Sequence, residues 1–403
     1  MRDGIADLEK KRASRSSRIF LTGGTGFLGS HIAAGFLEAG HPVCLLVRPD
    51  KGLSARERID RLLDWHGVGV GSRRNLRLVE GMLEAPGLGM NARVRSVVLE
   101  TTDEIIHCAS NTLFSEKKRA AVEAANIEGL LNVLDLAADS RCCFFHHLST
   151  AYVAGRKTGL CLEEAADSGE FTNVYEETKA RGEKLAAERC RRAGIRLNIY
   201  RPTIVYGDSR TGRSIRFNAV YHPVKMAVFF KDLYTGDIRD DGGKKAGLIG
   251  VRLQSDGRLF LPLRIRAGPG GGINLIPVDF FTRAFLALWE ECREGGIFHI
   301  ASSRQKRIDD IIEYAKVFFQ LQGIESYCPA TGREEPRNAL EVLFDKYLEA
   351  YEPYMRDTRI FDMANSSPIL ERHRVRCPEF DYEVFARCMA YAVEVDWGAR
   401  LFK

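Results

Sequence analysis

The stretch Thr22-Gly23-Gly24-Thr25-Gly26-Phe27-Leu28-Gly29 decides the fold prediction, because its glycines recur at positions 23, 26 and 29. An apolar run typical of a buried strand, residues 18–22, precedes it, and a helical pattern over residues 27–39 follows. Glycine permits a tight turn and a close approach of phosphate to the start of a helix, where unpaired N–H groups attract anions. This strand–turn–helix therefore predicts a dinucleotide site made by Thr22, Gly23, Thr25, Gly26, Phe27, Leu28 and Gly29.

Short apolar runs and helical patterns alternate through the first half of the chain. Further strands are predicted at residues 43–47, 76–79, 104–109, 142–149 and 197–205, and helices at residues 55–65, 119–138 and 172–193. Such alternation is typical of β–α–β units, in which helices bury both faces of a set of parallel strands. We therefore expect an α/β fold with a Rossmann-type, doubly wound parallel sheet.

The pattern changes after Gly207, where glycine-rich segments separate short apolar runs. We expect residues 18–207 to form the dinucleotide-binding domain and residues 208–403 to form a smaller, mostly helical substrate-binding region. A helical pattern and an apolar run within residues 273–300 predict that this segment returns to the first domain. Residues 1–17, rich in Lys and Arg, are expected to be a disordered basic leader.

The composition argues against several classes of protein. With 59 Lys and Arg against 54 Asp and Glu, the net charge is +5, and the basic residues are spread along the chain, so no nucleic-acid partner is expected. No uncharged apolar run reaches about 18 residues, so no transmembrane helix is expected. The ten cysteines form no CxxC pair or Cys/His cluster, which predicts no metal site and no disulfides, as in a protein of the reducing cytoplasm.

The end of the second strand predicts which nicotinamide cofactor binds. An acidic residue there suits the ribose 2′-hydroxyl of NADH, whereas an arginine suits the 2′-phosphate of NADPH. Arg48 follows Gly29 by 19 residues and ends the predicted strand, which favours NADPH. Asp50, two residues later, leaves NADH as the alternative.

Tyr175 and Lys179 form a candidate acid–base pair, because their spacing places them on one face of the predicted helix. A phenol has a pKa near 10, and we expect the Lys179 ammonium to lower it and so make the proton easier to transfer. Thr150 lies 25 residues earlier, at the end of the predicted fifth strand. A hydroxyl at that edge can donate to a substrate oxygen that becomes negative. Each feature is common alone, but together they predict a site at the carboxyl edge of the sheet.

Four motifs, taken in order, resemble one family. They read TGGTGFLG from residue 22, STAYVAG from residue 149, YEETK from residue 175 and NIYRPTIVYGDSRTG from residue 198. This order resembles the extended short-chain dehydrogenases/reductases. STAYVAG, RPTIVYGDSRTG and NLIPVD, at residues 274–279, are similar more narrowly to the branch with thioester-reductase domains and fatty acyl-CoA reductases of the male-sterility type. The resemblance covers residues 18–300.

The resemblance implies roles for the catalytic candidates. Thr150 would be the hydroxyl member, with Ser149 as its alternative, and Tyr175 and Lys179 would be the acid–base pair. Lys179 would also hold the ribose of the cofactor. Asn126, in the predicted helix before the fifth strand, matches an asparagine that supports the active site, with packing inside the helix as the alternative.

The resemblance also implies contacts to the cofactor. Ala109 and Ser110 match the segment after the fourth strand that passes the cofactor, and the backbone from Pro202 to Ile204 matches the part that receives the nicotinamide carboxamide. Met82 departs from the pattern, because the branch often has an acidic residue after the third strand to hold adenine. An apolar contact from Met82 would take its place.

The reaction implied is reduction of an acyl thioester, on CoA or an acyl-carrier protein, to an aldehyde and, by a second hydride, to an alcohol. A ketone, a secondary alcohol or a sugar nucleotide suits the same side chains, and a cofactor-binding protein without catalysis is a third hypothesis. Residues 208–213 either border the substrate, with Arg210 or Arg213 on a phosphate, or form a solvated loop. Residues 217–230 could line an acyl tunnel, touch a membrane surface or form a core helix. The oligomeric state is left open.

Overall fold

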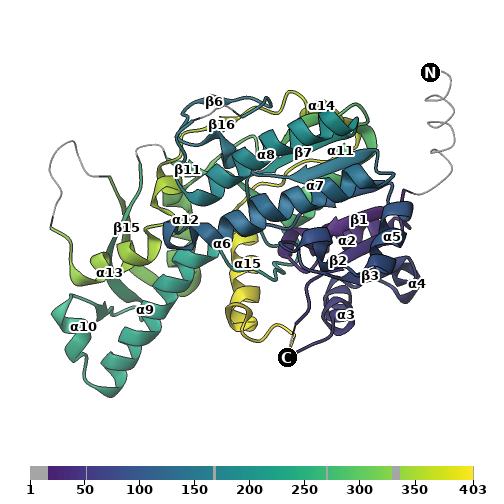
Figure 1. Ribbon diagram of the computed structural model, residues 1–403. Helices are drawn as coiled ribbons and strands as arrows, with labels where there is room; N and C mark the ends of the chain where they lie inside the picture. The colour runs from purple at the N-terminus through teal and green to yellow at the C-terminus, as the bar shows by residue number, and fades with distance from the viewer. Residues whose placement is uncertain (1–16, 51, 167–168, 269–270, 329–335, 403) are drawn as a thin grey trace.

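The computed structural model describes residues 17–50, 52–166, 169–268, 271–328 and 336–402. All of the predicted basic leader except Ser17 lies outside these residues. The body of the described chain is a large sheet with helices against it, and a smaller lobe built around α9, α10 and α13 projects from one end (Figure 1).

The predicted doubly wound parallel sheet is confirmed. It has seven strands in the order β13-β7-β5-β4-β1-β2-β3, and all neighbours run parallel. Their bounds are β1 Ile19–Thr22, β2 Val43–Val47, β3 Leu76–Glu80, β4 Glu104–His107, β5 Phe144–Leu148, β7 Arg196–Pro202 and β13 Gly296–Ile300. The order reverses between β1 and β4, and ligands of such sheets bind at the carboxyl ends of the strands beside that point.

Successive residues of the central strands face opposite sides of the sheet, as the period of two in a strand requires. Leu21 of β1 and Ile106 of β4 belong to one apolar cluster, and Phe20 and Ile105 belong to another. The first cluster contains residues of α2 (Phe27–Glu38), α3 (Ala55–His66) and α11 (Val278–Glu291). The second contains residues of α5 (Ala92–Thr101), α7 (Gly129–Asp139) and α8 (Val174–Ala193). Both faces of the sheet are therefore buried by helices.

Two predicted elements are interrupted where they approach the site. The helix expected over residues 119–138 is divided into α6 (Arg119–Glu123), a π-helical turn (η3, Ala124–Glu128) and α7. The strand expected over residues 197–205 ends as β7 at Pro202 and resumes as β8 (Ile204–Tyr206), which pairs with β12 (Leu275–Pro277). Single π-helical turns inside α-helices occur frequently at functional sites.

The C-terminal lobe contains a three-stranded sheet that the sequence analysis did not predict. Its order is β15-β10-β9, with bounds β9 Arg252–Leu253, β10 Leu259–Arg266 and β15 Leu321–Tyr327. The helices packed around it are α9 Tyr221–Asp240, α10 Lys244–Leu248, α12 Ile308–Phe319, α13 Ala339–Leu348 and α15 Tyr382–Glu394. The alternating burial of β10 identifies it as a strand, but Pro262 in its middle and the glycines around it weaken that signal in the sequence.

Short elements connect the lobe to the body. Two small ladders join β6 (Leu160–Cys161) with β16 (Ile360–Phe361), and β11 (Gly272–Ile273) with β14 (Lys306–Arg307). The remaining short helices are α4 Val70–Arg73 and α14 Ser367–Arg372, with 3₁₀ turns at η1 Pro86–Gly89, η2 Glu116–Lys118, η4 Ala151–Ala154, η5 Glu352–Arg356 and η6 Asp396–Gly398.

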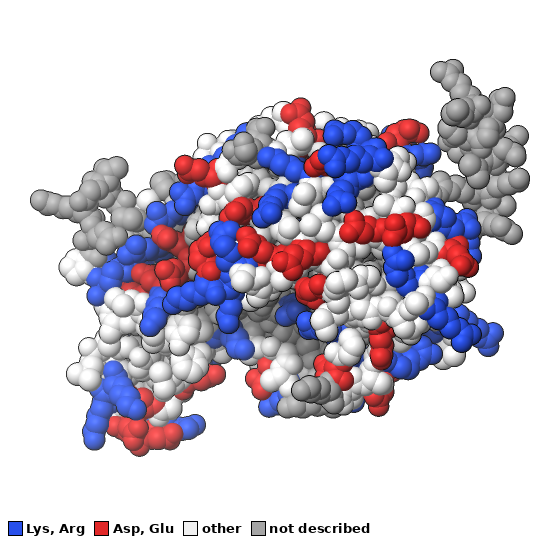
Figure 2. All heavy atoms as spheres, viewed as in Figure 1, with Lys and Arg blue, Asp and Glu red and all other residues white. Residues whose placement is uncertain are grey.

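Acidic and basic side chains are interspersed over the face of the molecule seen in Figure 2, without a continuous basic stripe across it. The same face is hollowed between the C-terminal lobe and the body. Within the described ranges, no helix combines the length and the apolar character needed to cross a membrane.

Candidate active site

A cavity of about 1320 Å³ lies at the carboxyl edge of the sheet and extends into the C-terminal lobe. Its walls include fourteen of the residues predicted to bind the cofactor or to act in catalysis. These are Thr22, Gly23, Thr25, Gly26, Phe27, Leu28, Gly29, Arg48, Ala109, Thr150, Tyr175, Lys179, Pro202 and Ile204. Asn126, Met82, Arg210 and Arg213 do not line it.

The glycine turn between β1 and α2 requires glycine at two positions. Gly23 has φ +76°, and a Cβ there would lie 2.6 Å from the backbone nitrogen of Ala109. A Cβ on Gly29 would lie 2.2 Å from the carbonyl oxygen of Gly23. The helix α2 begins at the Gly26 N-cap without a capping side chain, so its first-turn N–H groups face the cavity with a partial positive charge. The turn can therefore hold the pyrophosphate of a dinucleotide.

Thr22 joins the carboxyl ends of β1 and β4. Its hydroxyl lies 3.0 Å from Nδ1 of His107 and accepts a hydrogen bond from the Ala109 N–H at 3.3 Å. This contact holds the segment after β4 against the glycine turn, so the two chain segments that border the cofactor groove keep a fixed spacing.

Two arginines meet at the end of β2. Arg48 lines the cavity, and so does Arg58 from α3, whose Nη1 donates to the Arg48 carbonyl oxygen at 2.7 Å. Asp50, the residue that left NADH open, does not line the cavity, and its carboxylate accepts from the Gly52 N–H at 3.0 Å. The sequence analysis missed Arg58. Its signal would have been a basic residue near the start of the helix that follows the second strand.

The expected adenine contact at Met82 is wrong, because that side chain is 46% exposed and does not line the cavity. The next two residues, Leu83 and Glu84, do line it. The wall after β3 therefore offers both an apolar side chain and a carboxylate, and the acid stands two residues after the position where the motif suggested it.

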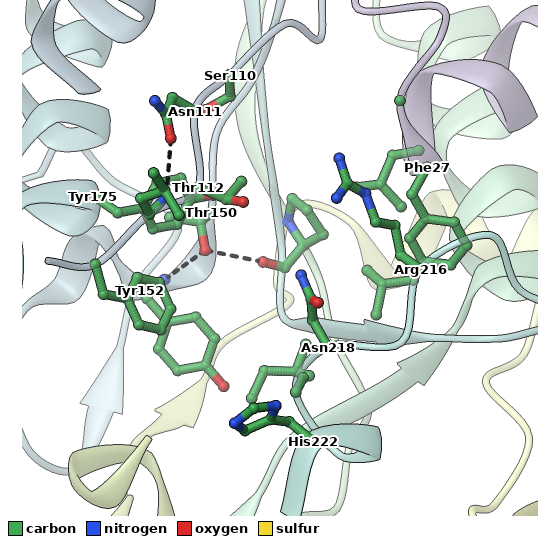
Figure 3. Close-up of a pocket in the computed structure, with 18 of the residues that line it drawn as sticks. Phe27, Ser110, Asn111, Thr112, Thr150, Tyr152, Tyr175, Arg216, Asn218 and His222 are labelled. Atoms are coloured by element: carbon green, nitrogen blue, oxygen red, sulfur yellow. Dashed lines mark hydrogen bonds between the residues drawn. The ribbon is translucent and has the colours of Figure 1, made fainter. Parts of the chain in front are cut away.

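Tyr175 and Thr150 come together at the centre of the cavity (Figure 3). The Thr150 hydroxyl lies 3.5 Å from the Pro202 carbonyl oxygen and accepts from the Tyr152 N–H at 3.3 Å. Burial raises the pKa of the Tyr175 phenol, and a hydrogen bond with Thr150 partly opposes this shift. Tyr175 is thus a protonated donor directed into the cavity, with the Thr150 hydroxyl beside it.

Lys179 does not lower the pKa of Tyr175 in this structure, contrary to our expectation. Its ammonium donates instead to the Leu148 carbonyl oxygen at 2.6 Å, at the end of β5. Burial lowers the pKa of Lys179 from 10.5 to about 8. The amine is therefore mostly protonated at neutral pH but close to its titration range.

Asn126 lies in the π-helical turn and uses all four of its hydrogen-bonding positions within the chain. Its Oδ1 accepts from the Ser110 hydroxyl (3.0 Å) and the Asn111 N–H (2.7 Å), and its Nδ2 donates to the Asn111 carbonyl and the Thr178 hydroxyl (both 3.0 Å). No group is left for a ligand, so Asn126 is a positioning residue rather than a catalytic one. It ties the segment after β4 to α8, which carries Tyr175.

The NLIPVD motif, at residues 274–279, holds the backbone from Pro202 to Ile204, which is expected to receive the nicotinamide, by hydrogen bonds. The Thr203 hydroxyl donates to Asn274 Oδ1 at 2.9 Å, and the Ile204 N–H donates to the Asn274 carbonyl at 3.2 Å. At the other end of the motif, the Asp279 carboxylate accepts from the Ser209 N–H (2.9 Å) and hydroxyl (3.0 Å). The polar residues of this motif therefore hold the turn after β7 and the loop after β8.

Of the two alternatives for residues 208–213, the structure favours the solvated loop over a phosphate contact, since neither Arg210 nor Arg213 lines the cavity. The Arg213 guanidinium lies 4.3 Å from the centre of the Trp65 ring and donates to the Trp65 carbonyl oxygen, and the Arg210 side chain is 81% exposed. Arg216, three residues further on, does line the cavity. Figure 3 shows it with Phe27 on the side of the pocket opposite Tyr175.

An aromatic wall separates Tyr175 from the C-terminal lobe. The Phe114 ring lies 6.0 Å from the Tyr175 ring and 5.6 Å from the Tyr354 ring. The Tyr354 hydroxyl donates to the buried Glu176 carboxylate at 2.5 Å and accepts from Asn173 Nδ2 at 2.7 Å, which anchors it to the start of α8. No sequence signal identifies Tyr354, because it follows Tyr175 by almost half the chain.

Comparison with known proteins agrees with this geometry. The family model described as "Male sterility protein", an NAD-binding domain, matches residues 21–285. The fatty acyl-CoA reductase wat of Drosophila melanogaster is 26% identical over 260 residues, which is 55% of this chain and 50% of that protein. The chain spans half or less of the length of such curated relatives.

Solved structures show the same fold. The terminal R domain from the myxalamid PKS-NRPS biosynthetic pathway has a TM-score of 0.73 at 22% identity, over 95% of this chain and 92% of that one. A thiolation-reductase di-domain from an archaeal non-ribosomal peptide synthetase has a TM-score of 0.66 at 17% identity, over 95% and 76% of the two chains.

The family model covers more than half of the chain, including the glycine turn, Thr150, Tyr175 and Lys179. The chain therefore belongs to the male sterility protein family, a family of NAD-binding domains.

Proposed function

We propose that this chain is an NADPH-dependent reductase of an acyl thioester, carried on CoA or an acyl-carrier protein, that yields an aldehyde and, after a second reduction, an alcohol. The observation that carries the proposal is the single cavity that joins the glycine turn, the Thr150–Tyr175–Lys179 group and an apolar interior in the C-terminal lobe. The similarity to a fatty acyl-CoA reductase and to a thiolation-reductase di-domain supports the thioester as substrate.

The residues on the cofactor side fit NADPH. The uncapped start of α2 suits a pyrophosphate, and Arg216 faces the same part of the cavity. Arg48 and Arg58 together offer two guanidinium groups to a 2′-phosphate, the contact that distinguishes NADPH from NADH. Lys179 would hold the nicotinamide ribose, and the backbone from Pro202 to Ile204 would receive the carboxamide.

The cofactor, when bound, supplies the hydride. The Tyr175 phenol and the Thr150 hydroxyl donate to the thioester carbonyl oxygen as negative charge develops on it. Tyr175 then gives its proton to this oxygen, which forms a hemithioacetal. Collapse of the hemithioacetal breaks the C–S bond, and the hydroxyl proton passes to the sulfur, so that the aldehyde and the free thiol of CoA or the carrier are released. Asn126 contributes indirectly, because it holds the helix that carries Tyr175.

The cysteines of the described chain fit a reducing compartment such as the cytoplasm. Cys142, Cys190 and Cys388 are free, buried thiols, and burial raises their pKa values. Such thiols are inert core residues and are typical of proteins that do not depend on disulfides.

The test is a substrate panel with purified chain and NADPH. We expect loss of NADPH with saturated acyl-CoA thioesters, and aldehyde or alcohol identified by mass spectrometry. The panel includes NADH in place of NADPH, and simple ketones and nucleotide sugars in place of the thioester. Turnover of a ketone or a nucleotide sugar without any reduction of a thioester would overturn the proposal and favour the other chemistry of this fold. Thr150→Val serves as the low-activity control, because it removes one of the two oxyanion donors.

A further inference from the structure

The cavity continues beyond the aromatic wall into a compartment within the C-terminal lobe. Residues of four elements line it: Val224 and Ala227 of α9, Ile265 of β10, Ile311 and Ala315 of α12, and Ile324 of β15. Each exposes less than a tenth of its surface. The compartment is therefore lined by residues of the core of the lobe.

The charges of the cavity are confined to its other half. The Arg, Lys and Glu residues in the described walls are Arg48, Arg58, Glu84, Lys179 and Arg216. The first four belong to segments of the sheet domain, and Figure 3 shows Arg216 beside Phe27 of the glycine turn. The six side chains named for the compartment carry neither a charge nor a hydrogen-bonding group, whereas Asn218 and His222 line the cavity near the start of α9. Because polar groups buried without partners cost free energy, the shape and chemistry of the compartment favour an apolar chain over a sugar or a peptide.

A second cavity, of about 330 Å³, adjoins the first within the lobe. It is lined by β10, α13 and the turn after α13, and it includes charged residues such as Asp345 and Lys346. Ile265 and Met355 line both cavities. These two side chains therefore form the wall between the apolar compartment and the second cavity.

The two side chains of this wall differ in how easily they change conformation. Ile265 belongs to β10, whose pairing with β15 fixes its backbone and whose branched side chain has few rotamers. Met355 belongs to the 3₁₀ turn Glu352–Arg356, and its carbonyl oxygen accepts from the Gly268 N–H at 3.4 Å. Its unbranched thioether adapts easily to different neighbours.

We infer that the compartment receives the apolar chain of the thioester and that Ile265 and Met355 are the end wall that limits the length of this chain. The inference rests on the proposed function for the identity of the reacting group. It adds the residues that determine specificity and predicts where a longer chain would go when they are made smaller, namely into the second cavity.

The first experiment measures kcat/KM with saturated acyl-CoA thioesters from butanoyl to octadecanoyl. Each methylene that enters the compartment should raise kcat/KM by up to about fourfold until the chain meets the wall, after which the gain stops. Met355→Ala and the double variant Ile265→Ala/Met355→Ala should move this limit to longer chains, judged from kcat/KM for each length relative to butanoyl-CoA in the same variant. A length limit unchanged in both variants, with thioesters still reduced, would overturn the inference.

A variant that fills the compartment gives the opposite result and does not depend on the first pair. Ala315→Leu should shorten the preferred chain, judged from kcat/KM for each length relative to butanoyl-CoA in the same variant. Val317→Leu is the matched control, since Val317 lies on the same helix but is 54% exposed and lines neither cavity. Equal length profiles for Ala315→Leu and Val317→Leu would count against the compartment as the chain site.

Binding without turnover separates this inference from the proposed reaction. Calorimetric titration with a series of saturated fatty acids should show a length limit that moves in the same directions in the same variants. If the fatty acids bind in this way but no thioester is reduced, the proposed reaction is wrong, but the compartment is still the binding site of an apolar chain. If thioesters are reduced but fatty acid binding ignores all the substitutions, the compartment is not the chain site.

Discussion

The two ends of the same central strands are built in opposite ways. At the amino end of β4, the buried Glu104 carboxylate accepts from four groups: Ser17 (3.0 Å), Trp289 (2.8 Å), Arg293 (3.1 Å) and His146 (3.1 Å). At the carboxyl end of neighbouring β5, the buried Lys179 ammonium donates to the Leu148 carbonyl, its one hydrogen-bond partner among the described residues. The Glu104 carboxylate is therefore fully hydrogen-bonded within the fold, whereas the Lys179 ammonium has N–H donors left for a ligand.

The amino-end network also has a defined direction of donation. Asn198 Nδ2 donates to the Tyr200 hydroxyl (3.2 Å), so that hydroxyl is free to donate to His146 Nδ1 (3.0 Å). His146 then carries its proton on Nε2, which faces Glu104. The Glu104 carboxylate, both His146 ring nitrogens and the Tyr200 hydroxyl are all paired, which indicates a stabilising role. At the carboxyl end, donors such as Tyr175, Arg48 and Arg216 border a cavity instead, which indicates chemistry.

The largest expected effect is at the carboxyl end. Tyr175→Phe removes the proposed proton donor and leaves the ring in place, so kcat should fall by about 10²–10⁴-fold. The free energy of unfolding should change little, and NADPH should still bind, as measured by cofactor fluorescence. Activity within tenfold of the original would remove Tyr175 from its proposed role.

Glu104→Gln should show the reverse pattern. Burial alone would raise the pKa of Glu104, but its partners, His146 first, lower it from 4.5 to about 2. A lowered carboxyl pKa stabilises the fold fully above pH 4.5 or so, and this stabilisation is lost as the pH falls toward 2. It corresponds to about 3 kcal/mol at neutral pH.

Urea unfolding across a pH series measures this contribution. Glu104→Gln should lower the free energy of unfolding by about 3 kcal/mol at pH 7 and by much less at pH 3. The kcat of the molecules that remain folded should be unchanged. A loss of kcat without a loss of stability would mean that the amino end of the sheet also contributes to the reaction. The two ends of the strands would then not have separate roles.

The comparison also explains what could be predicted from the sequence. The glycine turn, Thr150, Tyr175 and Lys179 lie in short motifs whose spacing follows from a strand, a turn or one helical repeat, and all of them line the cavity. The groups that the sequence analysis missed come from tertiary contacts. Tyr354 meets Tyr175 only because the C-terminal chain packs over the edge of the sheet.

The predictions that named the wrong residue failed for the same reason, because tertiary contacts decide which residues line the cavity. Met82 and Arg213 were placed by counting along motifs, but the chain turns between the motif and the cavity, so Glu84 and Arg216 line it instead. The sheet of the C-terminal lobe was missed because β10 and β15 are separated by two helices and a strand of the main sheet. Their pairing depends on contacts that no local pattern encodes.

A smaller effect tests the arginines at the end of β2. Arg58→Ala should raise the Kd of NADPH about tenfold or more and leave that of NADH unchanged, because a charged hydrogen bond to the 2′-phosphate is lost. Arg56→Ala is the control on the same helix. Arg56 pairs with Asp60 at the surface (3.3 Å) and does not line the cavity. If both variants weaken NADPH binding equally, general charge rather than a specific contact explains the preference.

The smallest effect is a pH dependence at Lys179. Because burial lowers its pKa to about 8, half of the amines lose their charge near pH 8, and NADPH affinity should fall about twofold there and further at pH 9. Neighbouring groups do not titrate in this range, since burial brings the pKa of His107 to about 3 and that of Cys108 to about 12. Lys179→Met should bind NADPH more weakly, but with an affinity that is flat from pH 7 to 9. If the NADPH affinity of Lys179→Met still falls between pH 7 and 9, another group causes the decline. The charge of Lys179 would then not be what binds NADPH at the carboxyl end of the sheet.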